Sequence, residues 1–408
     1  MITTPACEPA PPPQRSRHWP AITAAALTAT VTVMPGFAIG ALAPAIETSL
    51  DISRTTLGLA LSSFYAATAV GSPIAKRIAA RLPVHAVLSA AALIAAAVLL
   101  AAAQAHGPTL LTAALVVGGL GNALVQPAAG RLIAARTPTH RRSLAAGIVG
   151  AALAAATLIP GLLVALVLPD YGWRSALVTA GLLALIPAAL TARMRTPATP
   201  LPPPPAPAPR RQARATLMMW SLAAALSATG NNAVATYFVR LGTDSGLPAR
   251  TAGNLLALSA LLAIAVRITA GILTDRAPRR NPAVIASMML AGGLGLALIS
   301  TGTPATFVLG AMLAFSAGWG WTGLLLATAL HLVPNRTENA GHTVQVGIYT
   351  GAAVAPFAFA ALSDTVGHTA ATLACAAAAV AAAGAVVTGS LLFAGARRGG
   401  RSGYLGRG

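Results

Sequence analysis

Long apolar runs, separated by short polar segments, recur along the whole chain. Each run has about the 20 residues that an α-helix needs to cross the hydrocarbon core of a membrane. The runs are continuous and rich in Ala and Leu, as in Ala90–Ala103, whereas the strands of a transmembrane β-barrel alternate. The pattern therefore predicts an all-α polytopic membrane protein with twelve transmembrane helices. We expect the helices near residues 20–43, 56–76, 84–104, 109–133, 144–168, 174–192, 216–238, 251–273, 283–301, 305–328, 341–363 and 369–394.

One long interruption divides these helices into two sets of six. It combines a run of prolines with five arginines, which is typical of a semi-rigid spacer and not of a folded domain. The two sets also echo each other, because a shift of 195 residues places Gly58 on Gly253 and Arg81 on Arg276. The predicted order is a cytoplasmic Pro/Arg tail (1–18), an N-terminal six-helix bundle (19–192), a cytoplasmic Pro/Arg linker (193–215), a pseudo-symmetric C-terminal six-helix bundle (216–394) and a cytoplasmic Gly/Arg tail (395–408).

Composition and charge agree with a membrane location. Of the 408 residues 56% are hydrophobic and 9% are charged, which excludes a soluble globular protein. The net charge of +19 would suggest nucleic acid in a soluble protein, but here topology explains it better. With a cytoplasmic N-terminus, 22 of the 27 Lys and Arg residues fall in cytoplasmic segments and 4 fall outside. We expect a multi-pass protein of the cell (plasma) membrane, the inner membrane in a bacterium, with both termini cytoplasmic.

The loop after the eighth predicted helix carries a recognisable motif. Gly271–Arg280 fits G-x-L-x-D-R-x-x-R-R at every fixed position, and the chain thereby resembles the major facilitator superfamily of twelve-span secondary transporters. The resemblance implies transport of a small solute by alternating access, and a gating role for this loop. In the corresponding loop of the first half, Lys76 and Ala80 depart from the motif. The gating-loop residues are Gly271, Asp275, Arg276, Arg279 and Arg280.

By that resemblance, Asp275 latches the cytoplasmic side shut at the start of a helix in the opposite bundle, near Ser143. Free N–H groups and the macrodipole favour an anion at a helix N-terminus. Ala80 cannot form the matching latch. We therefore expect a resting state that is biased toward an open cytoplasmic side.

Polar residues within the predicted helices are the candidates for a substrate cavity. Arg267 is the one charged residue away from the ends of the predicted spans, and it either snorkels toward Asp275 or contacts an anionic substrate. Carboxamides that face lipid would be costly, so they should point inward as cavity lining or as interhelical hydrogen bonds. The candidates are Tyr65, Asn122, Gln126, Asn231, Asn232, Arg267, Gln345 and Tyr349.

Nothing in the sequence indicates an enzyme, a metal site or a cofactor. Gly318–Gly323 matches a dinucleotide-binding pattern, but it lies within a predicted span and lacks the required strand. No carboxylate lies deep in a span, so we expect facilitated diffusion or proton coupling through other groups, such as His342. The expected partners are membrane lipids, a small-molecule substrate and, as a candidate coupling ion, the proton; we expect a monomer and no nucleic acid. A non-transporting receptor or scaffold on the same fold is the alternative.

Overall fold

A computed structural model describes residues 19–137, 142–194, 211–274, 281–332 and 337–402, which form helices and short turns. The helices that precede residue 195 are α1 (Trp19–Ala41), α2 (Ala43–Leu50), α3 (Arg54–Arg81), α4 (Val84–Ala103), α5 (Pro108–Ala123), α6 (Val125–Arg136), α7 (Arg142–Leu166) and α8 (Leu168–Ala192). The helices that follow residue 210 are α9 (Arg211–Thr236), α10 (Phe238–Asp244), α11 (Ala249–Thr274), α12 (Asn281–Ser300), α13 (Pro304–Leu332) and α14 (Thr337–Ser402). We call these two groups the first and second halves of the chain.

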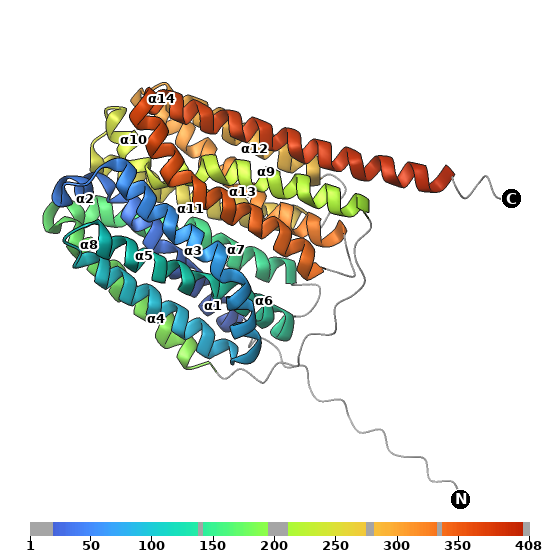
Figure 1. Cartoon of the computed structure of the whole chain (residues 1–408), viewed down its shortest axis with the longest axis horizontal. Coiled ribbons are helices and arrows are strands. Elements are labelled where there is room, and N and C mark those ends of the chain that lie inside the picture. Colours follow the sequence, from blue (N-terminus) through green and yellow to red (C-terminus); the bar gives the residue numbers. More distant parts are fainter. Residues whose placement is uncertain (1–18, 138–141, 195–210, 275–280, 333–336, 403–408) are drawn as a thin grey trace, which may run out of the picture.

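The long helices run side by side between two ends of the molecule (Figure 1). The short helices α2 and α10 lie at one end, which we call the α2/α10 end. Helix α1 begins and α14 finishes at the other end, which we call the terminal end. Helix α14 covers 66 residues in two arms, and the chain reverses direction between the arms at Gly367, whose φ of 85° suits glycine. Gly172 in α8 has a similar φ of 75°, and the 195-residue repeat relates these two positions.

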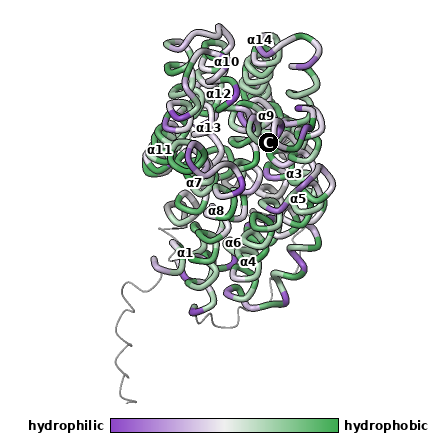
Figure 2. The backbone as a smooth tube through the Cα atoms, turned by 90° about the vertical axis from the view of Figure 1, so that its left-hand side faces the viewer, coloured by the Kyte–Doolittle hydropathy of each residue, from purple (hydrophilic) through white to green (hydrophobic). Residues whose placement is uncertain are grey.

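The prediction of an all-helical membrane protein is confirmed. Among the described residues, ten helical ranges are long and apolar enough to cross a membrane, and one of them, Thr343–Phe393, contains the turn at Gly367. Large apolar side chains point outward, including Val70 at 77% and Leu391 at 67% exposure, and the helices are hydrophobic along most of their length (Figure 2). Such a large apolar surface is unfavourable in water but suits contact with the hydrocarbon of a membrane. The predicted helix at 109–133 is divided at Leu124 into α5 and α6.

The buried apolar residues form three clusters, whose positions differ between the two ends. One cluster joins the halves and contains side chains from both, such as Ile46 and Leu57 with Phe238 and Phe359. A second lies within the first half, at the terminal end, and includes Ile22, Val84 and Leu132. A third lies within the second half at the same end. The described core is therefore shared near the α2/α10 end and separate near the terminal end.

Glycines permit the closest contacts between the halves. A Cβ on Gly40 of α1 would lie 2.7 Å from the Thr236 carbonyl oxygen, and one on Gly58 of α3 would lie 2.9 Å from the Pro356 oxygen. On α7, a Cβ at Gly161 would lie 2.7 Å from the Gly253 oxygen of α11. Each approach is too close for a larger residue, so three helix pairs across the halves require glycine here.

Candidate functional site

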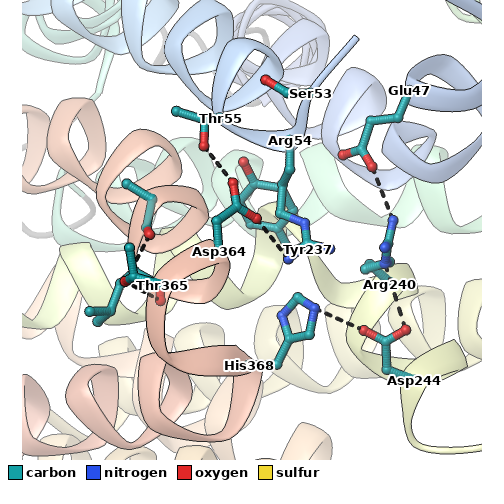
Figure 3. Close-up of polar contacts among 12 residues, drawn as sticks. Glu47, Ser53, Arg54, Thr55, Tyr237, Arg240, Asp244, Asp364, Thr365 and His368 are labelled. Carbon is teal, nitrogen blue, oxygen red and sulfur yellow. Dashed lines mark hydrogen bonds and ion pairs between the residues drawn. The ribbon is translucent and has the colours of Figure 1, made fainter. Parts of the chain in front are cut away.

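Ionisable side chains from both halves meet at the α2/α10 end (Figure 3). Arg54, in the first turn of α3, places Nη1 3.3 Å from Oδ1 of Asp364 on α14. The neighbouring Thr55 donates a hydrogen bond of 2.6 Å from Oγ1 to the other oxygen of Asp364. Ser53 caps α3 by accepting a hydrogen bond from the Thr56 N–H, which fixes the start of this helix. A helix start in one half is thus tied to a carboxylate in the other.

A second link lies beside the first. Arg240 of α10 donates from Nη1 to Oε2 of Glu47 on α2 at 3.0 Å, and its Nε lies 3.6 Å from Oδ1 of Asp244 one turn along the same helix. His368, directly after the turn at Gly367, lies with Nε2 3.2 Å from Oδ2 of Asp244. We call Glu47, Arg54, Arg240, Asp244, Asp364 and His368 the charge network.

Burial affects the most enclosed member of the network. The Glu47 side chain is 13% exposed, and burial raises the pKa of its carboxyl above the ordinary value of 4.5. The guanidinium groups of Arg240 and Arg54 act in the opposite direction and offset part of this rise. Because the net shift is upward, burial destabilises the Glu47 carboxylate more than its cationic neighbours stabilise it.

Farther from the α2/α10 end than the charge network, further polar contacts join α14 to neighbouring segments. Ser62 accepts a hydrogen bond of 3.0 Å from the backbone N–H of Phe357, the residue after Pro356. Tyr237 donates from its hydroxyl to the Pro356 carbonyl at 3.2 Å, and its ring stacks on Phe359. These contacts connect α3 and the segment between α9 and α10 to α14 on either side of the peptide bond that joins Pro356 to Phe357.

Arg267 joins the halves nearer the terminal end. Its side chain is almost fully buried; Nε donates to the Trp319 carbonyl of α13 at 3.0 Å and Nη1 donates to the Gly150 carbonyl of α7 at 2.6 Å. The guanidinium carbon lies 5.6 Å from the centre of the Trp319 ring, and Nη2 has no hydrogen-bond partner. The two carbonyl contacts hold the side chain between α7 and α13, and Nη2 is left as a donor that a substrate anion could use. Asp275, the other expected partner of Arg267, lies outside the described residues.

Tyr65 connects to Arg267 through aromatic rings. The Tyr65 ring lies 6.3 Å from Phe37, which in turn lies 5.7 Å from Trp319. Tyr65 is 4% exposed and its hydroxyl is buried without a hydrogen-bond partner. These rings come from α3, α1 and α13, so the aromatic contacts connect the two halves. They lie between the charge network and Arg267 along the length of the molecule.

The predicted carboxamides make contacts of different kinds. Asn122 donates to the Thr68 hydroxyl of α3 at 3.3 Å, and Asn231 donates to the Gly318 carbonyl of α13 and to Ser227. Asn232 donates to the Ala228 carbonyl of its own helix. These are the interhelical and local hydrogen bonds that formed the alternative to cavity lining.

The other predicted site residues lie elsewhere. Gln126 is exposed, and Gln345 and Tyr349 are half-buried and interact with each other on α14. The structure thus brings Gln345 to Tyr349 and, through Phe37 and Trp319, Tyr65 toward Arg267. Asp275, Arg276, Arg279 and Arg280 lie outside the described residues, and Gly271 is placed within α11 by its backbone alone.

Sequence reasoning missed the charge network. It counted Arg54 and Arg240 as topological charges and the acids as residues of span ends. The available signal was scarcity: the whole chain has eight acidic residues, and Glu47, Asp244 and Asp364 are three of them. Acids that are so rare and lie close to the ends of apolar helices are candidates for ion pairs with arginines at neighbouring helix ends.

Fold and surface together define a multi-pass α-helical membrane protein. The family model of the Major Facilitator Superfamily matches residues 25–356, and the chain belongs to that superfamily of membrane transporters. No curated protein sequence matches the chain.

Proposed function

We propose that the protein is a secondary transporter that moves a small solute across the membrane by alternating access. In this proposal the chain crosses the membrane twelve times, in two six-helix bundles that correspond to the two halves. The crossings are α1, α3, α4, α5 with α6, α7, α8, α9, α11, α12, α13 and the two arms of α14. Transporters of this type bind solute between two such repeats and expose it to one side at a time.

The orientation follows from charge. Positive residues favour the cytoplasmic side, and 22 of the 27 Lys and Arg residues belong to the segments that we expect to be cytoplasmic. Those among them that the structure describes, such as Lys76, Arg136 and Arg214, lie toward the terminal end. We therefore place both termini in the cytoplasm and the α2/α10 end outside. The membrane is then the cell membrane, with the charge network at its outer surface.

One observation carries the proposal: the halves share a core cluster toward the α2/α10 end and have separate clusters at the terminal end. Ion pairs and a glycine contact reinforce the same end, at Arg54–Asp364, Glu47–Arg240 and Gly40–Thr236. Two rigid bodies held at one end and separable at the other correspond to one of the two states that alternating access requires. The state supported here is closed outside, in line with the expected bias toward an open cytoplasmic side.

The test is solute flux with a removable lock on the α2/α10 end. The background variant carries Cys7→Ser and Cys375→Ala, and the lock adds Thr55→Cys and Asp364→Cys, whose native side chains touch across the halves. A thermal-shift screen of the purified protein selects solutes, and flux is then measured in proteoliposomes with and without a pH gradient. We expect a short, reducible bifunctional thiol reagent to stop flux in the double-cysteine variant, and reductant to restore it.

Each single-cysteine variant, treated with the same reagent, is the control and should keep its flux. Flux that continues through the locked protein would contradict alternating access. Saturable solute binding without flux in any condition would instead favour a receptor.

A further inference from the structure

The charge network contains more negative than positive charge. Its members are Glu47, Arg54, Arg240, Asp244, Asp364 and His368. Three of these are carboxylates and two are arginines, so the network has a net charge of −1 when the histidine is neutral. A surplus charge in a partly buried cluster is unfavourable, and the binding of one proton removes it.

His368 is poorly arranged to hold that proton. Its Nε2 faces Asp244, whereas its Nδ1 is buried without a hydrogen-bond partner. Protonation at Nδ1 would create a buried N–H with no acceptor and would add a third cation close to Arg54 and Arg240. The balancing proton therefore belongs on a carboxyl group.

The three carboxylates are not equivalent. Asp364 and Asp244 each have two partners and side-chain exposures of 40% and 39%. Glu47 is 13% exposed and has Arg240 as its partner, which it shares with Asp244. Glu47 thus carries the charge with the least hydration and the least compensation in the network.

We propose that the Glu47 carboxyl is a proton-binding site that controls closure of the α2/α10 end, an inference that rests on the proposed alternating-access function. The charged groups that act on Glu47 are Arg240 of α10, Arg54 of α3 and Asp364 of α14. Two of these three elements move with the second half, so opening separates Glu47 from them and lets water reach it. Proton binding at Glu47 therefore depends directly on whether the α2/α10 end is open or closed, although no carboxylate lies deep in a predicted span.

The sign follows from linkage. Closure buries Glu47 and raises its pKa above 4.5, so the closed state binds the proton more tightly than an open state with a hydrated carboxyl. By reciprocity, the proton favours the closed state to the same extent. The contribution of this proton to closure is fully present below pH 4.5 and is lost as the pH rises through the raised pKa.

The test is the distance between spin labels in nanodiscs from pH 4.5 to 8.5. One pair, Ser49→Cys with Ala249→Cys, spans the halves at exposed positions of the α2/α10 end; a second pair, Leu82→Cys with Arg214→Cys, reports the terminal end. In the background without native cysteines, we expect the open-to-closed ratio at the α2/α10 end to rise with pH. One linked proton limits the rise to about tenfold per pH unit.

Three substitutions locate the proton. Glu47→Gln keeps the shape and an oxygen for Arg240, and it should hold the end closed at every pH. Asp51→Asn removes an exposed carboxylate four residues away and should leave the titration intact. His368→Gln keeps a donor for Asp244 and should also leave it intact. Loss of the titration in His368→Gln but not in Glu47→Gln would overturn the assignment.

The outcomes separate this inference from the function on which it rests. If the label distances respond to solute or to the Thr55–Asp364 lock but not to pH, the proton site is wrong and alternating access stands. If neither pair responds to solute, lock or pH, both are wrong.

Discussion

A single methyl group on Gly161 tests the packing that holds the halves together. A Cβ at this position of α7 would lie 2.7 Å from both the Ala257 nitrogen and the Gly253 oxygen of α11. Ordinary contacts begin at 3.4 Å, so Gly161→Ala is short of room by 0.7 Å. Both neighbours are backbone atoms in a helix and cannot rotate away, so α7 and α11 must move apart as units. Overpacking of this kind costs about 1–3 kcal/mol.

Gly147→Ala is the matched control, because it makes the same change on the same helix where a Cβ meets nothing within 4 Å. Replacing a helical glycine by alanine stabilises by about 0.5–1 kcal/mol, and both variants receive this gain. We therefore expect Gly161→Ala to be less stable than Gly147→Ala by about 1–3 kcal/mol. The free energy of unfolding, measured by reversible denaturation in mixed micelles, gives the difference. Equal stabilities would refute the close approach of α7 to α11 and the shared core built around it.

Further expectations concern the other contacts between the halves. Ser62→Ala should cost about 0.5–1.5 kcal/mol because it removes the hydrogen bond that the Phe357 N–H makes to α3, whereas Ser63→Ala, which loses a bond within its own helix, should cost less; unfolding measurements distinguish the two. Arg267→Met should change stability by no more than about 2 kcal/mol, since the removed charge has an unpartnered Nη2 and its two carbonyl acceptors belong to helices; a larger loss would contradict this reasoning. The latch implied by the family motif stays a prediction: Asp275→Ala should widen the terminal end, as seen by spin labels there.

Much of the fold could be predicted from the sequence, because the hydropathy of a segment and the positions of its glycines can be read from the residues of that segment alone. Apolar runs predicted the long helices, and the 195-residue shift that pairs Gly58 with Gly253 also relates Gly172 to Gly367, where the structure has positive φ angles. The break at Leu124 was not predictable in this way. It depends on a tightened turn in which the Leu124 N–H bonds to the Gly121 carbonyl, and such a change leaves hydropathy unaltered.

The contacts of the candidate site were harder to predict, since they depend on the tertiary fold. The partners in the two cross-half links of the charge network, Glu47 with Arg240 and Thr55 with Asp364, are 193 and 309 residues apart in the sequence. Arg267 was identifiable as a charge inside a span, but its partners are backbone carbonyls, which residue types do not reveal. Residue chemistry therefore identified which groups needed partners, and only the packing of the helices determined which partners they received.

The strength of the ties at the α2/α10 end matters for the proposed cycle. Ion pairs with partly exposed side chains, such as Arg54–Asp364 and Glu47–Arg240, contribute about 0–1 kcal/mol each. A change of one unit in a linked pKa corresponds to about 1.4 kcal/mol, which is as large as either pair. The halves are thus held by several weak polar contacts over a shared apolar core, and no single contact dominates. A proton on Glu47, or a solute that prefers one state, can therefore change the populations of the open and closed states measurably, because no single strong contact has to be broken.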